Sequence, residues 1–299
     1  MRRVLAVLVA AAALTVDASQ APSAPHAVIF EPRTPAFSPD GRSIAFVGST
    51  EDSPLARGSL FVTSSRGGAV RPLAEGLSFS FSPTWAPDGK RLVFAVGGDN
   101  GLYVVNVDGT GLRRIGDGCC PDWGPGGRKI AFERTSEGAP SYIGVVNPDG
   151  SGQRLVAVPN SVVEDELSLS FHSPTWSPGG VRLGFAAEDA GAEEAYLAAI
   201  DKFGGPVKKL VDADVWRPDW SPDGRRVLFS SGDVSDAVIR SYDLRTRRTR
   251  TIHPGYDARW SPDGREIVFV QNTSGPERTA LYVMKADGSG VRRLELRAS

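Results

Sequence analysis

Cysteine is nearly absent from the sequence: the chain has two, and they are adjacent, at Cys119 and Cys120. Neighbouring Cα atoms lie about 3.8 Å apart, closer than an ordinary disulfide allows, so the fold is not a disulfide scaffold. Two interpretations stay open for this pair. One is a strained vicinal disulfide in an oxidising compartment, and the other is two free thiols in a loop. The cost of the strained geometry favours the free thiols.

Histidine is also scarce, with only His26, His172 and His253. The sequence has no G-x-S-x-G nucleophile elbow, no H-E-x-x-H zinc motif and no phosphate-binding glycine loop between a strand and a helix. No recognisable catalytic set remains, and we expect neither a metal ion nor a cofactor. His172 and His253 have acidic residues nearby and could bind metal, but isolated histidines are more often structural.

Excess charge is lacking as well, because 34 Lys and Arg face 35 Asp and Glu, which leaves a formal net charge of −1. A balanced charge gives no reason to expect nucleic acid or an anionic membrane surface as a partner.

The sequence begins with a segment typical of export signals. Arg2 and Arg3 precede an apolar run, Val4–Val16, and small residues follow at Ala18 and Ala21. The run is shorter than the roughly 20 residues of a transmembrane helix. We therefore assign residues 1–21 to a signal peptide and expect a periplasmic or secreted protein with no stable membrane insertion. The alternative is an uncleaved membrane anchor.

A repeat dominates the remaining chain, as in Trp220-Ser221-Pro222-Asp223-Gly224 followed by Val227 and Phe229. Each copy has an aromatic residue two positions before a proline, glycine two after it, an aliphatic residue five after it and phenylalanine seven after it. The six anchoring prolines are Pro39, Pro87, Pro125, Pro178, Pro222 and Pro262.

Each copy predicts a strand, a tight turn and a second strand. Proline and glycine suit the turn, and apolar residues two apart predict strands with a buried face. A second hairpin follows in each unit, most clearly at Asp108-Gly109, Asp149-Gly150 and Asp287-Gly288. Four strands in each of six units, at a period near 45 residues, predict an all-β, six-bladed β-propeller of four-stranded antiparallel blades.

The repeated W-S-P-D-G-x-x-I-x-F pattern resembles the propeller repeat of the TolB-like (PD40) family, which also occurs in relatives of dipeptidyl peptidase IV. The resemblance covers residues 35–299. It implies the propeller fold, whereas propellers of this kind serve as scaffolds, binding modules and accessories of enzymes. No residues remain for the hydrolase domain of the peptidases.

Residues 22–34 precede the first repeat. Ile29 lies eight residues before Phe37, as Ile252 lies eight before Trp260. This register predicts a ring-closing role, in which Ala27–Glu31 adds to the sixth blade beside Val291–Leu296.

The loops that enter the first strand of each blade vary in length, and variable loops on a rigid scaffold often carry function. They contain the candidate binding residues. These are Asp165, His172, Trp216, Arg217, His253 and Tyr256. Trp216 is the only tryptophan outside the repeat position. The opposite face consists of short, uniform turns.

Two hypotheses follow. The first is a non-enzymatic exported module, expected to be a monomer, that binds a protein or peptide at the variable-loop face, with Trp216 as its anchor. The second is a propeller hydrolase or lyase that acts on carbohydrate at the channel mouth through a cluster of His172, His253 and acidic groups. The missing catalytic set favours the first hypothesis.

Overall fold

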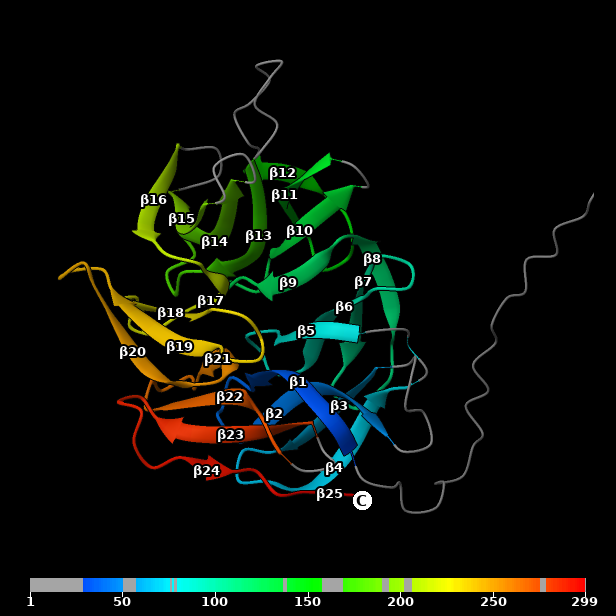
Figure 1. Cartoon of the computed structure of the whole chain (residues 1–299). Helices are drawn as coiled ribbons and strands as arrows, with labels where there is room; N and C mark the ends of the chain where they lie inside the picture. The colour runs from blue at the N-terminus through cyan, green and yellow to red at the C-terminus, as the bar shows by residue number, and fades with distance from the viewer. Residues whose placement is uncertain are drawn as a thin grey trace, which may run out of the picture.

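A computed structural model describes residues 29–50, 58–75, 77, 80–136, 139–157, 169–189, 194–201, 206–274 and 278–298. Within these ranges, 25 strands form six sheets around a central axis (Figure 1). The all-β, six-bladed propeller predicted from the repeats is confirmed. The described ranges contain no helix that is long and apolar enough to cross a membrane.

Consecutive strands pair antiparallel within each blade, and the first strand of each blade lies nearest the axis. Blades 1 to 3 comprise β1 (Ile29–Phe37), β2 (Ser43–Thr50), β3 (Ser59–Ser64) and β4 (Gly68–Ala74); β5 (Ser80–Trp85), β6 (Arg91–Val96), β7 (Gly101–Asn106) and β8 (Arg113–Asp117); and β9 (Cys119–Trp123), β10 (Ile130–Ser136), β11 (Ala139–Val146) and β12 (Arg154–Ala157).

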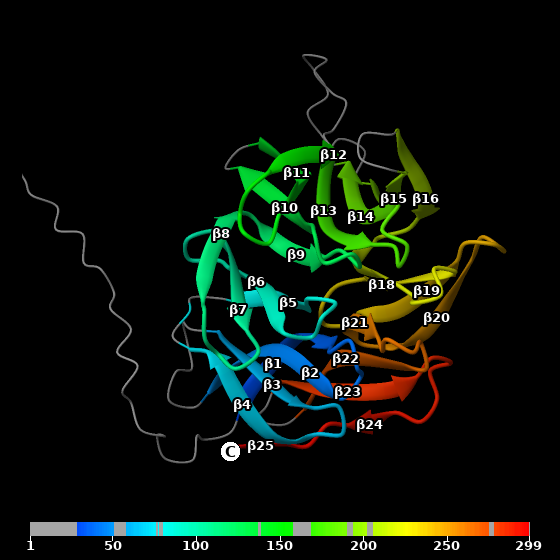
Figure 2. The same ribbon diagram turned by 180° about the vertical axis from the view of Figure 1, so that it is seen from behind.

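Blades 4 to 6 repeat the same arrangement (Figure 2). They comprise β13 (Leu169–Trp176), β14 (Arg182–Asp189), β15 (Glu194–Asp201) and β16 (Val207–Asp212); β17 (Trp216–Trp220), β18 (Arg226–Ser231), β19 (Val238–Asp243) and β20 (Arg248–Pro254); and β21 (Tyr256–Trp260), β22 (Glu266–Asn272), β23 (Thr279–Lys285) and β24 (Arg292–Arg293). The innermost strands contact one another around the whole ring, and β1 contacts both β5 and β21.

The repeat motif forms the turn between the first two strands of each blade, as the first copy shows. The Gly41 amide donates to the Ser38 carbonyl at 2.8 Å, and the Ser38 hydroxyl donates to Asp40 at 2.6 Å. The six turn glycines have φ between 65° and 71°, a region that favours glycine. The uniform short turns therefore all lie at one end of the propeller, which we call the turn face.

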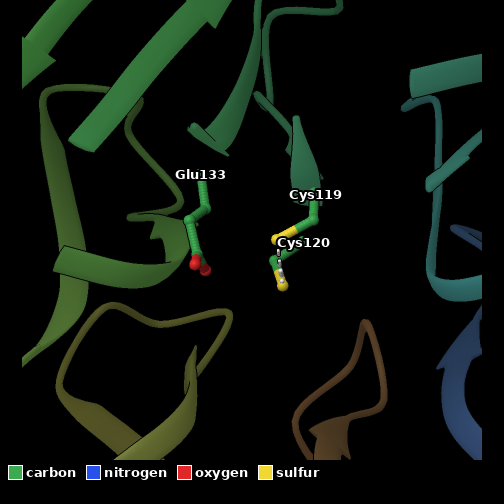
Figure 3. A group of neighbouring side chains, drawn as sticks. All are labelled: Cys119, Cys120 and Glu133. Carbon is green, nitrogen blue, oxygen red and sulfur yellow. Dashed lines mark hydrogen bonds between the residues drawn. The ribbon is translucent and has the colours of Figure 1, made fainter. Parts of the chain in front are cut away.

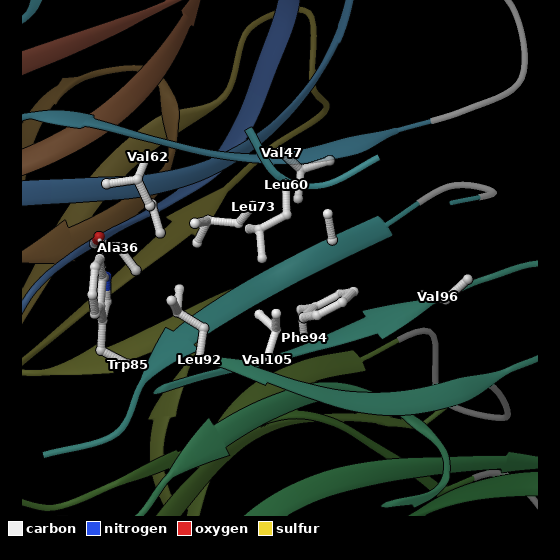
Figure 4. Close-up of a cluster of buried hydrophobic side chains, with 12 residues drawn as sticks. Ala36, Val47, Leu60, Val62, Leu73, Trp85, Leu92, Phe94, Val96 and Val105 are labelled. Carbon is white, nitrogen blue, oxygen red and sulfur yellow. Dashed lines mark hydrogen bonds between the residues drawn. The ribbon is translucent and has the colours of Figure 1, made fainter. Parts of the chain in front are cut away.

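Six buried hydrophobic clusters lie between neighbouring blades, one at each interface. Figure 4 shows the cluster between blades 1 and 2, where Trp85 packs against Ala36 and its Nε1 donates to the Ala36 carbonyl at 3.0 Å. The six repeat phenylalanines are fully buried. Each repeat tryptophan also belongs to one of these clusters, and Phe37 packs against the cluster between blades 6 and 1.

Ring closure differs from our expectation. Ile29 and Phe30 pair with Thr50 and Ser49, so the described part of the 22–34 segment belongs to the innermost strand of blade 1 and not to blade 6. Residues 22–28 lie outside the described residues. The ring is instead closed from the other end, because β25 (Leu296–Ala298) pairs in parallel with β4 as a fifth strand of blade 1.

The reason for this closure lies in the last blade. Its outer strand β24 is only two residues long, so the chain leaves blade 6 early and crosses to blade 1. There, Gly68 donates its amide to the Glu295 carbonyl at 2.7 Å, and Arg292 donates to the Ser65 carbonyl at 3.0 Å. Unpaired backbone groups along the edge of β4 thereby gain partners.

Candidate functional site in and around the central channel

Each innermost strand carries a bulge at the same place, three residues before the repeat aromatic. The pairing with the second strand shifts register there in all six blades. The residue at the bulge has a φ between 48° and 53°, a left-handed conformation that only a few per cent of non-glycine residues adopt. Bulges redirect the side chains of the residues at these six positions. These are Thr34, Ser82, Cys120, Ser173, Arg217 and Asp257.

Arg217 connects blades across the channel. Its Nε lies 3.0 Å from Oδ1 of Asp257 in the next blade, and its Nη1 also donates to the Ser82 hydroxyl in blade 2, on the opposite side of the ring. The Nε–H group is not aligned as a hydrogen bond to Oδ1, so that contact is electrostatic. Burial disfavours the charge on Arg217 and is the largest single effect, but the negative groups around it, Asp257 first, together outweigh burial and raise the pKa of Arg217.

The network continues to the seam between the last and first blades. Oδ2 of Asp257 accepts the backbone N–H of Thr34 at 3.1 Å, and the Thr34 hydroxyl accepts the N–H of Ser82 at 3.2 Å. Polar groups of four blades are therefore bonded to one another inside the channel. Arg217, expected to contact a partner, is engaged within the molecule.

His172 and Glu133 form an ion pair between blades 4 and 3. Nδ1 of His172 lies 2.9 Å from Oε1 of Glu133, and Oε2 of Glu133 accepts the N–H of Ser173 at 3.1 Å. Nε2 of His172 faces Glu188 at 3.8 Å. Burial opposes both charges but is outweighed, so the pKa of Glu133 is lowered by His172 and the pKa of His172 is raised by Glu133.

These shifts predict a stability contribution that depends on pH. The pKa of His172 is raised in the folded protein. Its contribution to the free energy of unfolding is therefore fully present below the unfolded pKa, about 6.5, and is lost as pH rises through the folded value. The lowered pKa of Glu133 makes its contribution present above about 4.3 and lost as pH falls through the folded value. The pair should therefore stabilise the fold most between those two pH values.

His172→Gln tests this prediction. We expect a loss of about 1–2 kcal/mol in the free energy of unfolding near pH 5.5, the size of a charge-assisted hydrogen bond, and a smaller loss near pH 9. Urea unfolding of both proteins at each pH measures the difference. Lys208→Gln serves as the control, because this exposed cation pairs with Asp201 on the surface. An equal loss for His172→Gln at both pH values would contradict the prediction.

Trp216 and Tyr256 lie side by side at the variable-loop end of blades 5 and 6, with ring centroids 5.8 Å apart. The indole Nε1 of Trp216 donates to the Gly232 carbonyl at 3.1 Å, and its ring is only partly buried. Tyr256 is 5% exposed and donates from its hydroxyl to Asn272 at 3.2 Å. Of these two candidates, Trp216 is therefore accessible to a partner, whereas the buried Tyr256 packs against its ring.

The remaining candidates lie apart. His253 packs against Phe269, with ring centroids 5.2 Å apart, and its Nδ1 contacts the Pro254 carbonyl at 2.7 Å. Asp165 lies outside the described residues. Among the residues that the structure describes, no group of three or more metal-ligating side chains unites His172 with His253, which is the grouping that the lyase hypothesis requires.

A second polar layer lies nearer the turn face, one residue before the repeat aromatic in five of the six blades; blade 1 has Ala36 there. Asp122, Asp219 and Arg259 line a pocket of about 180 Å³ there, together with the turn prolines Pro39 and Pro262. Arg259 Nη1 lies 3.1 Å from Asp219. Burial raises the pKa of Asp122 to about 7 and also raises that of Asp219, although Arg259 opposes both shifts.

Our sequence reasoning missed this layer and Glu133, because it read the repeat only at positions shared by all copies. The signal is present at two fixed positions, three and one before the aromatic residue. The residue type at each of these two positions changes from blade to blade. Comparing the six copies at these two positions identifies the side chains that line the channel.

Comparisons with known proteins agree with this architecture. Residues 31–171 match the TolB beta propeller domain (PD40). The chain is 33% identical over 246 residues to the Tol-Pal system protein TolB of Gluconobacter oxydans, a match that covers 63% of this chain and 51% of that protein. The chain therefore spans about half the length of this relative.

Solved structures show the same fold. TolB from Acinetobacter baumannii superposes with a TM-score of 0.70 at 18% identity, over 87% of this chain and 64% of that one. An oligogalacturonate lyase in complex with manganese superposes with a TM-score of 0.58 at 17% identity, over 91% and 78% of the two chains. Likeness at such low identity concerns the fold alone. Residues 31–171 thus match a TolB-type (PD40) propeller domain, and the later blades of this six-bladed chain have the same fold and the same repeat motif.

Proposed function

We propose that this chain is an exported, non-enzymatic module that binds a protein or peptide at the variable-loop face. Its relative in Gluconobacter oxydans is a protein of the Tol-Pal system, and the matched region of this chain is its propeller. The rigid blades hold the entry loops at one end of the channel, which is where a partner would meet them.

The observation that carries the proposal is the fixed, partly exposed ring of Trp216. We call Trp216, Val234 and Asn272 the Trp216 patch. Gly232 accepts the indole N–H, and Asn272 both accepts the Tyr256 hydroxyl and donates to the Val234 carbonyl at 2.7 Å. Val234 is itself exposed.

These contacts hold an aromatic ring and an apolar side chain in place before any partner arrives. A pre-positioned side chain loses little freedom on binding, and tryptophan is among the residues that contribute most at interfaces. We include His172 and His253, both partly exposed, in the proposed polar rim of this site. We expect Asp165, which lies outside the described residues, to contribute to the same rim.

Trp216→Ala tests the docking site. The purified propeller is first cross-linked in the exported fraction to capture its partner, and the affinity of the captured protein is then measured. We expect Trp216→Ala to weaken binding by at least about 30-fold, the loss typical of an interface anchor. Arg225→Ala, an exposed residue of the turn face, should bind like the wild type. Wild-type affinity of Trp216→Ala combined with lost binding of Arg225→Ala would contradict the assignment.

Export is the second element of the proposal. Residues 1–21 have the basic start, short apolar run and small residues of a signal peptide. We expect the mature protein to begin near Ser19 or Pro22 and to accumulate outside the cytoplasm. N-terminal sequencing of the native protein checks this prediction, and recovery of Met1 would refute cleavage.

A further inference from the structure

Cys119 and Cys120 lie beside the Glu133 carboxylate in the channel wall (Figure 3). Both are free thiols, and their Sγ atoms are 3.1 Å apart. The two sulfurs and a Glu133 oxygen all lie within 4.8 Å of one another, the only such group of metal-ligating side chains in the described part of the chain. We propose that these three residues bind a divalent cation of the zinc class.

The backbone explains why the two thiols meet. Successive side chains of a strand normally point to opposite faces. Cys120 occupies the bulge of β9 with φ of 50°, which turns its side chain so that both sulfurs approach each other. The other five blades have the same bulge but different side chains at these two positions. They carry Arg33-Thr34, Phe81-Ser82, His172-Ser173, Trp216-Arg217 and Tyr256-Asp257. Only blade 3 therefore presents two thiols.

The donor set suits a zinc-class ion. Thiolate sulfur selects Zn²⁺ and Cd²⁺ over harder cations, and a carboxylate oxygen is an accepted third ligand. With bonds of about 2.3 Å, tetrahedral coordination places two sulfurs about 3.8 Å apart. The sulfurs of Cys119 and Cys120 need to separate by about 0.7 Å from their present 3.1 Å, within reach of a side-chain rotation. Three protein ligands leave a fourth position for water or an exogenous donor.

Neighbouring groups hold the third ligand in place. Glu133 receives the His172 ring at Oε1 and the Ser173 amide at Oε2, and such outer contacts orient metal ligands. The cysteines also lie near Arg217, which forms an ion pair with Asp257. The contact with Cys120, burial and the charge of Glu133 raise the pKa of Cys119.

Binding therefore exchanges one divalent cation for two protons. Each thiol S–H bond breaks, its electron pair forms a metal–sulfur bond, and both protons leave to solvent. The total charge of the site stays constant. The site lies in blade 3, away from the Trp216 patch in blades 5 and 6, and it does not depend on the docking proposal.

The experiment titrates the whole mature protein, reduced and kept under argon, with Zn²⁺ and with Cd²⁺. We expect one equivalent to bind, two protons to be released, and the ultraviolet thiolate-to-cadmium absorption band to appear. Affinity should rise with pH, because cysteine binds a metal as the thiolate.

Variants separate the ligands from their surroundings. Cys119→Ser and Cys120→Ser should each reduce the absorption band and weaken binding by about 100-fold or more, whereas Glu133→Gln should keep the band and weaken binding by about 10–100-fold. Val181→Ala, at a residue that is 57% exposed, should bind like the wild type. Circular dichroism confirms the fold of each variant.

Three results would overturn the proposal. The first is no saturable binding at one equivalent. The second is unchanged affinity in Cys120→Ser. The third is a mass two hydrogens lower in protein isolated from its native compartment, because a Cys119–Cys120 disulfide would occupy both ligands.

Discussion

Trp220→Ala should lower the free energy of unfolding by about 3–5 kcal/mol, the usual cost of truncating a buried tryptophan. Trp220 is 6% exposed and belongs to the cluster between blades 4 and 5 with Leu197 and Val215. Its indole nitrogen lies only 2.9 Å from where a Cβ on Gly184 would stand, so the ring packs directly on the backbone of blade 4.

A comparison with Trp85 sharpens this prediction. The Trp85 indole donates to the Ala36 carbonyl, whereas Nε1 of Trp220 has no hydrogen-bond partner among the described residues. A buried, unpaired N–H group lowers stability, so removing it offsets part of the cavity cost. Trp85→Ala should therefore cost more than Trp220→Ala.

Urea unfolding at constant m-value measures both losses. Val181→Ala is the control, because Val181 is 57% exposed and its truncation should change stability by less than about 0.5 kcal/mol. A loss below about 1 kcal/mol for Trp220→Ala would show that the repeat aromatic does not hold the interface.

The blades could be predicted from the sequence because every copy of the repeat meets the same structural requirements. Gly41 and its five equivalents all need a left-handed φ, and Phe46 and its equivalents all need burial, so both recur at fixed offsets. Such requirements leave the same residue type in each copy and can be read without a structure.

The channel lining could not be read in this way. Its bulge is shared by all blades, but the side chain at the bulge is threonine, serine, cysteine, arginine or aspartate, so no consensus marks the position. The contacts that matter join residues far apart in the sequence, such as Arg217 with Ser82 and His172 with Glu133. They exist only once the ring has closed.

Ring closure was predicted wrongly because the register of Ile29 is compatible with two arrangements. Ile29 lies eight residues before Phe37 in either arrangement. Its segment could form an outer strand of blade 6 or extend the innermost strand of blade 1. The long hairpin of β1 with β2 and the short β24 favour the second arrangement, and both lengths depend on pairing that the sequence does not display.

Asp257 occupies the centre of the contacts that join the last blade to the first. Its Oδ1 faces Arg217 at 3.0 Å, and its Oδ2 accepts the amide of Thr34 in blade 1. The side chains of Arg217 and Asp257 are only 23% and 6% exposed, so neither charge is well hydrated without the other. Strands β1 and β21 meet at this point, across the seam of the ring.

Asp257→Ala should therefore destabilise the fold by about 3–5 kcal/mol, since it leaves Arg217 with an uncompensated charge in a buried site. Arg217→Ala should lower the free energy of unfolding by a similar amount, because it leaves the buried Asp257 carboxylate without its positive partner. The double variant should lose less than the sum of the two, with a coupling of about 1–3 kcal/mol, because the second substitution removes the charge that the first one left alone.

A surface pair provides the matched control for this cycle. Arg182 and Asp201 are 48% and 38% exposed, and Asp201→Ala should cost less than about 1 kcal/mol, because water hydrates the remaining charge. Urea unfolding of the four proteins of the cycle, with Asp201→Ala beside them, gives every term. If Asp257→Ala cost no more than Asp201→Ala, the contacts inside the channel would not hold the seam. Closure would then rest on the pairing of β25 with β4 and on the cluster between blades 6 and 1.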